Sequence, residues 1–194
     1  MNDPYEVIPF RHPIDANARV PGSKSYTNRY LVIAALAAGR STLRGVLLSD
    51  DTEAMLDCLA RLGIETTVDR TDGTTVVEGC GGRIPRAEAE LDVRQTGTTA
   101  RFITPMVALG RGRFVIDGHP QMRGRPMQEL VGALAQLGGR IEGSALPLTV
   151  IGGSNAESPI IRVAGDVSSQ FLSGLLLSGP YFPGGMRAIN VASS

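Results

Sequence analysis

Residues 21–29 read Pro-Gly-Ser-Lys-Ser-Tyr-Thr-Asn-Arg, and the unit that begins here sets the pattern for the rest of the chain. The glycine and serine free the backbone at a loop that runs into a predicted helix. Lys24, Ser25 and Arg29 follow within about one helical turn, and Ser25 and Arg29 share a helix face. A helix N-terminus also offers unpaired N–H groups and a positive dipole end. The stretch therefore predicts a compact site for a small phosphorylated or carboxylated anion.

This stretch is not a standard nucleotide-binding loop. It keeps only the tail of the Gly-x-x-x-x-Gly-Lys-Ser/Thr pattern, and no Gly-x-Gly-x-x-Gly follows a predicted strand. Taken alone, it could equally be a surface turn before an ordinary basic helix start. The anion site is favoured because similar arrangements recur further along the chain.

The composition limits the classes of function. With 194 residues, the chain can form one domain or a compact pair, and its 19 basic and 19 acidic side chains cancel. No overall field therefore attracts nucleic acid or a membrane. There is no apolar run of 18 residues and no signal-peptide pattern at the start, so a cytoplasmic location is expected.

The cysteines and histidines indicate no metal site or cofactor. Cys58 and Cys80 are expected to be buried thiols of a reducing compartment, with a disulfide between them as the less favoured alternative. His12 and His119 are the two histidines, and neither stands in ligand spacing. A dedicated zinc site is therefore not expected.

Hydrophobic periodicity and helix-ending glycines predict an internal repeat of about 70 residues. The predicted helices cover 25–38, 51–62, 98–109, 126–137 and 168–178, and the predicted strands cover 41–46, 64–69, 74–78, 113–117, 140–142 and 147–151. The order of elements occurs twice, and a third copy is cut by the end of the sequence. This pattern predicts an α/β (α+β) fold whose helices pack inside and whose sheets lie outward or sideways.

The first helix of each copy begins with a polar cluster. The clusters are Lys24, Ser25 and Arg29; Gln95 to Arg101, which includes Gly97 and Thr98; and Ser168, Ser169 and Gln170. If the copies are arranged with approximate symmetry, three positive helix ends point to one centre and form an anion pocket. The alternative for each cluster is simple capping by serine or threonine, which stabilises a helix by ~1 kcal/mol and needs no ligand.

The second helix of each copy begins differently. Ser-Asp-Asp-Thr at 49–52 is a cap with acidic residues in the first turn. Met-Arg-Gly-Arg-Pro at 122–126 instead places Arg123 and Arg125 before a predicted helix that starts at the proline. Because arginine is unfavourable at a helix start, an anionic ligand or a nearby carboxylate such as Asp117 is expected there.

Five ordered motifs make the chain resemble the N-terminal part of the 5-enolpyruvylshikimate-3-phosphate (EPSP) synthases. They are Pro-Gly-Ser-Lys-Ser…Asn-Arg (21–29), Leu-x-Ser-Asp-Asp-Thr (47–52), Gly-Thr-x-x-Arg (97–101), Met-Arg-x-Arg-Pro (122–126) and Ser-Ser-Gln-Phe-Leu (168–172). The resemblance implies a two-domain inside-out barrel with three βαβαββ units in each domain. Residues 1–20 would belong to the other domain, and 21–194 would form two complete units and an incomplete third.

The resemblance also implies the ligands and their contacts. Shikimate 3-phosphate would be bound by Lys24, Ser25, Arg29, Ser168, Ser169 and Gln170. Phosphoenolpyruvate, with the herbicide glyphosate as its competitor, would be bound by Lys24, Gly97, Arg125 and Gln170. Lys24 would act in catalysis without a cofactor, and Gln95, Thr98 and Arg101 would support the site. A planar guanidinium suits Arg125 to a carboxylate or phosphate, and glycine at 97 allows the backbone to approach a ligand.

The family's acid–base groups, and several arginines for phosphoenolpyruvate, are expected in a C-terminal half beyond residue 194. The chain is therefore expected to hold the shikimate 3-phosphate half-site and to be inactive without that partner. Gln95, Thr96 and Phe102 depart from the family's usual Asn-Ala-Gly-Thr and proline, which leaves glyphosate sensitivity open. Two alternatives stay open: a non-catalytic anion-binding fragment, and a relative that transfers enolpyruvyl to a UDP-sugar, for which neither cysteine is suitably placed.

Overall fold

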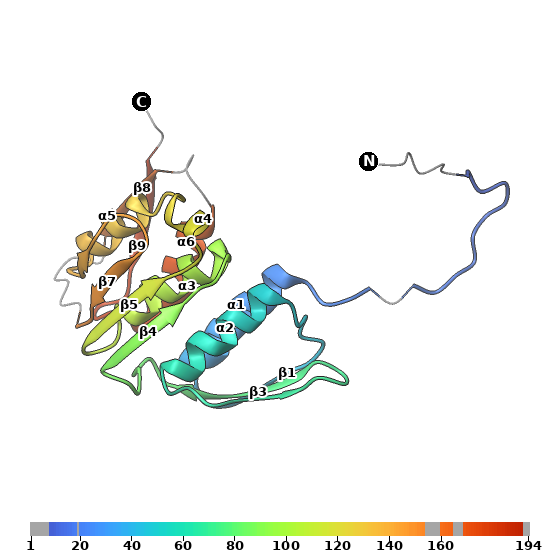
Figure 1. Cartoon of the computed structure of the whole chain (residues 1–194), viewed down its shortest axis with the longest axis horizontal. Coiled ribbons are helices and arrows are strands. Elements are labelled where there is room, and N and C mark those ends of the chain that lie inside the picture. The colour runs from blue at the N-terminus through green and yellow to red at the C-terminus, as the bar shows by residue number, and fades with distance from the viewer. Residues whose placement is uncertain (1–7, 19, 154–159, 165–168, 192–194) are drawn as a thin grey trace.

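The computed structural model of the chain describes residues 8–18, 20–153, 160–164 and 169–191. The elements in chain order are α1 (Lys24–Leu36), β1 (Ala38–Leu43), α2 (Asp50–Arg61), β2 (Thr66–Asp69), β3 (Thr74–Cys80), β4 (Glu88–Asp92), α3 (Gly97–Val107), β5 (Arg113–Asp117), α4 (Pro120–Arg123), α5 (Gln128–Gln136), β6 (Arg140–Glu142), β7 (Leu148–Ile151), β8 (Ile160–Ala164), α6 (Ser169–Ser178), a 3₁₀ turn (Gly179–Tyr181) and β9 (Arg187–Val191). Residues 8–18 form no helix or strand and run away from the folded body (Figure 1).

The first sheet has the strand order β1-β3-β2, and both of its pairs are antiparallel. Gly73 has a φ of +72° in the turn between β2 and β3, a conformation that glycine adopts without steric cost. Thr75 and Val77 of β3 are fully buried and alternate with more exposed neighbours. Helices α1 and α2 lie side by side along this sheet (Figure 1).

The second sheet repeats this arrangement with one strand more. Its order is β4-β5-β7-β6, in which β4 runs parallel to β5 and the other pairs are antiparallel. The hairpin β6–β7 therefore corresponds to β2–β3, and β5 corresponds to β1. The parallel pair β8–β9 corresponds in turn to β4–β5. This recurrence is the repeat that the periodicity predicts.

The helices pack against one another at the centre, as expected. Helix α3 contacts α1, α2 and α6, and Phe102, Ile103 and Met106 on it are fully buried. The approach of α3 to α6 is close because Gly174 of α6 has no side chain. A Cβ atom at Gly174 would lie 2.3 Å from the backbone oxygen of Arg101. The described residues form no helix long and apolar enough to cross a membrane.

Several predicted elements differ from the structure. The strand predicted at 41–46 begins at Ala38, because residues 38–40 pair with Cys80 to Glu78 and Arg40 forms an ion pair with Glu78. The helix predicted from Pro126 begins at Gln128, with Met127 as its N-cap. Periodicity also missed β4, an edge strand whose acidic side chains alternate with the inward-facing Ala89 and Leu91.

Both cysteines are free thiols, as predicted, although Cys80 is only half-buried. Cys58 of α2 is fully buried and donates to the backbone oxygen of Asp92. Burial, with help from Asp57 and Asp92, raises the pKa of the Cys58 thiol to about 12. The thiol therefore stays protonated in the folded chain far above the pH at which an unfolded cysteine ionises.

This shift predicts a loss of stability in alkali. Between about pH 9 and 12 the unfolded chain releases the Cys58 proton and the folded chain keeps it, so the free energy of unfolding falls as pH rises. The expected slope is about 1.4 kcal/mol per pH unit relative to Cys58→Ala. Urea unfolding of wild type and Cys58→Ala across this pH range measures the slope. If the free energy of unfolding of the two proteins changed with pH in the same way, the thiol would not be buried as described.

Candidate anion-binding site

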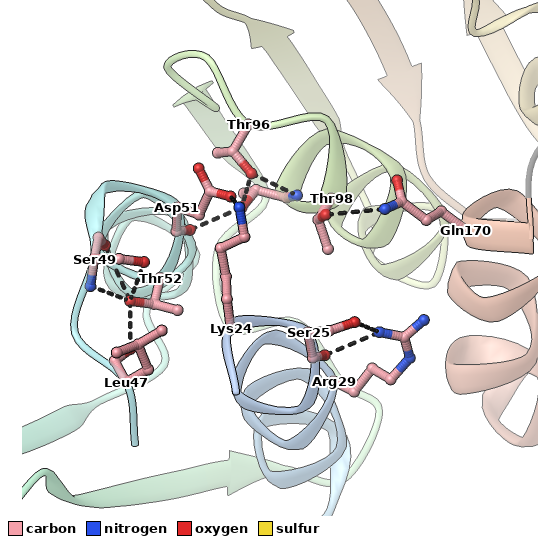
Figure 2. Close-up of polar contacts among 11 residues, drawn as sticks. Lys24, Ser25, Arg29, Leu47, Ser49, Asp51, Thr52, Thr96, Thr98 and Gln170 are labelled. Carbon is pink, nitrogen blue, oxygen red and sulfur yellow. Dashed lines mark hydrogen bonds and ion pairs between the residues drawn. The ribbon is translucent and has the colours of Figure 1, made fainter. Parts of the chain in front are cut away.

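The first turn of α1 presents a cation to two other helices. Ser23 caps the helix by accepting a hydrogen bond from the backbone N–H of Tyr26 at 3.4 Å. Lys24, the first helical residue, forms an ion pair with Asp51 of α2, with Nζ 2.6 Å from Oδ2. Figure 2 shows Lys24 extending from α1 toward the first turns of α2 and α3.

Asp51 also connects α2 to α3. The Thr99 hydroxyl of α3 donates to the backbone oxygen of Asp51 at 3.1 Å, and Thr99 N–H donates to the capping hydroxyl of Thr96 at 3.3 Å. Thr52 holds the loop before α2, since its hydroxyl accepts from Ser49 N–H and donates to the Leu47 oxygen. The starts of α1, α2 and α3 are thereby fixed around one point (Figure 2).

Arg29 connects α1 to α6. Its Nη1 donates to the Ser25 hydroxyl at 2.6 Å, and its Nη2 donates to the Ser173 hydroxyl of α6 at 3.3 Å. The guanidinium carbon also lies 5.2 Å from the centre of the Phe102 ring, a cation–π contact. These contacts hold the Arg29 guanidinium next to the Ser25 hydroxyl.

Gln170 bridges α6 and α3. Its Nε2 donates to the Thr98 hydroxyl at 3.3 Å, and its Oε1 accepts from Nη1 of Arg101 at 2.6 Å. Arg101 in turn stacks on Phe171, with 4.8 Å between the guanidinium carbon and the ring centre. The amide of Gln170 is therefore oriented by the helix that begins at Gly97.

Arg125 and Arg101 meet at Gly97. A methyl group at this glycine would lie 3.0 Å from Nη1 of Arg125 and 3.5 Å from Nη1 of Arg101. Burial, and then the charge of Arg125, lowers the pKa of Arg101. Two guanidinium groups therefore lie beside the positive end of a helix, an arrangement that an anion would relieve.

The charge in this region is unbalanced. Lys24 is paired with Asp51, but within residues 8–18, 20–153, 160–164 and 169–191 no carboxylate pairs with Arg29, Arg101 or Arg125. Lys24, Ser25 and Arg29 of α1 lie near Thr98 at the start of α3 and Gln170 at the start of α6 (Figure 2), and Arg101 and Arg125 come close to Gly97 at the same end of α3. Such a site favours a small, multiply charged anion.

The structure brings together nearly all of the predicted site residues that it describes. Those that share contacts here are Lys24, Ser25, Arg29, Gly97, Thr98, Arg101, Arg125 and Gln170, with Ser169 at the start of the same helix as Gln170. Ser168 lies outside the described residues.

Two predicted residues lie apart from this cluster. Gln95 is exposed and lines a separate groove of about 690 Å³ with Asp117 and His119. Arg123 forms a two-pronged ion pair with Asp117, with contacts of 3.0 and 2.6 Å that lower the pKa of this carboxyl. Arg123 is thus neutralised by a carboxylate, whereas Arg125 has no carboxylate partner in the described part of the chain.

Sequence reasoning missed two residues that shape the site. The sequence pattern predicts only helix capping for Asp51, which pairs with Lys24, and gives no prediction for Ser173, which accepts from Arg29. Ser173 stands four residues after Ser169, a spacing that places both on one face of α6 and could have indicated it. No group of three or more His, Cys, Asp or Glu side chains in the described part of the chain could hold a metal ion.

The family model and the curated relatives that match this chain all carry the name of one family. The family model of EPSP synthase (3-phosphoshikimate 1-carboxyvinyltransferase) matches residues 10–194. The 3-phosphoshikimate 1-carboxyvinyltransferase of Trichormus variabilis is 43% identical over 183 residues, which are 92% of this chain and 43% of that protein. The enzyme of that name from Mycobacterium ulcerans is 42% identical over 186 residues, 93% of this chain and 42% of the relative.

Solved structures agree on the fold. The EPSP synthase of Acinetobacter baumannii superposes with a TM-score of 0.79 at 24% identity, over 90% of this chain and 40% of that one. The enolpyruvyl transferase NikO of Streptomyces tendae gives 0.58 at 19% identity, over 79% of this chain and 35% of that one. These likenesses confirm the predicted fold class of repeated helix-and-strand units.

The chain thus spans less than half the length of the relatives that it matches. The match nevertheless covers nearly all of its own residues and includes every motif on which the resemblance depends. On this evidence the chain belongs to the EPSP synthase family.

Proposed function

We propose that this chain carries the shikimate 3-phosphate half-site of a 3-phosphoshikimate 1-carboxyvinyltransferase. The observation that supports this most directly is a set of arginines near the starts of α1, α3 and α6, close to Lys24, which pair with no carboxylate among the residues that the structure describes. A phosphate ester is a compact dianion that accepts hydrogen bonds from guanidinium, ammonium, hydroxyl and backbone N–H groups.

Shikimate 3-phosphate would be held mainly by α1 and α6. The proposed contacts are Lys24, Ser25, Arg29, Ser168, Ser169 and Gln170. Arg29 and Ser25 suit this role because their mutual hydrogen bond fixes a cation and a hydroxyl on the same side of α1. The contact between Arg29 and Ser173 keeps α6 next to them.

Phosphoenolpyruvate would be held beside it, at the start of α3. Its proposed contacts are Lys24, Gly97, Arg125 and Gln170, with Gln95, Thr98 and Arg101 in support. Gly97 suits this position because the guanidinium groups of Arg125 and Arg101 come within reach of its backbone. Glyphosate would compete for this second position.

In the proposed reaction the 5-hydroxyl of shikimate 3-phosphate adds to C2 of phosphoenolpyruvate, and phosphate is then eliminated. Lys24 would contact both substrates and offset the negative charge that accumulates between them. Proton transfer to C3 and from the hydroxyl also needs acid–base groups, which we assign to a C-terminal half of the enzyme. Residues 1–20 would belong with that half, 21–194 would form the substrate-binding domain, and the enzyme would work in the cytoplasm.

Calorimetric titration of the chain with shikimate 3-phosphate tests this proposal. Saturable binding is expected, and shikimate without the phosphate should bind far more weakly because the cations lose their partner. Absence of saturable binding would reject the half-site and favour an inert fragment. Phosphate release is expected only when a C-terminal half is added, so turnover by the chain alone would also contradict the proposal.

A further inference from the structure

Asn28 is a buried polar residue with no role in the site described above. It stands four residues after Lys24 on α1 and therefore lies one turn below it on the same face. Side chains on a helix lean toward its N-terminus, so the carboxamide is directed back to the turn that carries Lys24. Beyond it on this face come Leu31, Val32 and Ala35, all fully buried. Asn28 thus lies between the charged mouth of the site and the apolar core.

The carboxamide of Asn28 is unsatisfied by the protein. The residue has no exposed surface, and neither its Nδ2 nor its Oδ1 has a hydrogen-bond partner among the described residues. Buried side-chain amides are nearly always bonded to protein or to internal water, because an unpaired one loses its hydration without replacement. A group of this kind beneath a binding site indicates partners that come from the site.

A second helix shows the same feature. Arg101 stands four residues after Gly97 and so lies one turn below the start of α3, and its Nε is also buried without a partner in the described part of the chain. Helices α1 and α3 are in contact. Each of these two neighbouring helices therefore holds a buried polar group that no described protein atom satisfies, a situation in which internal water is the usual partner.

We propose that Asn28 is a positioning residue of the anion site. Its carboxamide bonds to water that enters from the site and thereby holds Lys24 and the first turn of α1 in the geometry that binds the anion. Asn28 acts through Lys24 and does not touch the ligand. This inference rests on the proposed function, because it concerns the site assigned to shikimate 3-phosphate.

Asn28→Leu and Asn28→Asp test the proposal, since both keep the approximate shape of the side chain. Asn28→Leu should weaken shikimate 3-phosphate binding by about tenfold and leave the melting temperature nearly unchanged, because the apolar side chain replaces both the carboxamide and the water bonded to it. Asn28→Asp should weaken binding further, because a carboxylate would stand below the cations. Asn28→Ser, which supplies a hydroxyl in place of the carboxamide and leaves room for water, should retain most of the affinity.

Thr75→Val is the matched control. Thr75 of β3 is also fully buried with an unpartnered hydroxyl, but it lies on a strand that contributes nothing to the site. Its replacement should leave the affinity unchanged. Equal binding by wild type and Asn28→Leu would overturn the proposal, as would equal losses from Asn28→Leu and Thr75→Val.

A failure of the Asn28 proposal can be told apart from a failure of the proposed half-site. If the wild-type chain does not bind shikimate 3-phosphate, the half-site is rejected and the role of Asn28 is decided by crystallography with inorganic phosphate. Ordered water within hydrogen-bonding distance of the Asn28 carboxamide and continuous with the site would support the positioning role. A carboxamide bonded only to protein atoms would refute it.

Discussion

Replacing Gly174 by alanine is expected to destabilise the protein by about 1–3 kcal/mol and to lower its melting temperature by roughly 3–10 °C. The added Cβ would lie 2.3 Å from the backbone oxygen of Arg101 and 3.2 Å from the Phe102 ring, so α6 must move away from α3. Gln170, on the same helix, would then leave Thr98 and Arg101. Shikimate 3-phosphate binding should therefore weaken along with stability.

Gly132→Ala provides the control for helix propensity. Gly132 is an exposed glycine inside α5, and a Cβ there would meet nothing within 4 Å. This change should stabilise the chain by about 0.5–1 kcal/mol and leave binding unaltered. Differential scanning calorimetry with ligand titration compares the two variants. If Gly174→Ala were as stable as Gly132→Ala, the two helices would not pack as closely as described.

Lys24→Met is expected to weaken shikimate 3-phosphate binding by about 10- to 100-fold with little change in melting temperature. The estimate follows from the ~1.5–3 kcal/mol typical of a hydrogen bond to a charged group. The Lys24–Asp51 pair is partly exposed, with side-chain exposures of 54% and 26%, and such surface pairs contribute only about 0–1 kcal/mol to stability. We therefore expect the Lys24 charge to matter more for binding the anion than for the stability of the fold.

Arg70→Met is a closely matched control for Lys24→Met. Arg70 pairs with Glu53 in the same first turn of α2, also at 2.6 Å, with side-chain exposures of 67% and 24%. The Arg70→Met substitution therefore removes one exposed cation and one ion pair without changing the anion site. Affinities for shikimate 3-phosphate are measured by calorimetry at low and at moderate salt. The affinity of Lys24→Met should fall below that of wild type, and the affinity of Arg70→Met should equal it. Equal losses would mean that the effect comes from net charge alone.

Several features of the fold were predictable because they are local. The apolar positions of α2, the glycines that end helices and the Asp72-Gly73 turn all act over a few residues, and their recurrence revealed the repeat. The polar starts of three helices were also visible, and the structure places them together. Strand β4 was not visible, because its identity depends on pairing with β5 and not on its own acidic sequence.

The two arginines at 123 and 125 show where local reasoning ends. The sequence indicated an anion or a carboxylate for both, without a way to separate them. In the folded chain Arg123 reaches Asp117 at the end of β5, and Arg125 reaches the start of α3 at Gly97. Whether each arginine meets a carboxylate or remains without one depends on the direction in which its side chain leaves the short turn around Gly124.

The amino-acid sequence by itself determined the repeated unit, the class of fold and the residue types that gather at helix starts, because periodicity and capping are encoded over short distances. Only the tertiary structure decided which groups are neutralised and which stay available to an anion. That distinction arises between helices: Asp51 faces Lys24, Ser173 faces Arg29, and Gly174 lets α6 approach Arg101. Contacts of this kind are set by packing between distant segments, which no local pattern specifies.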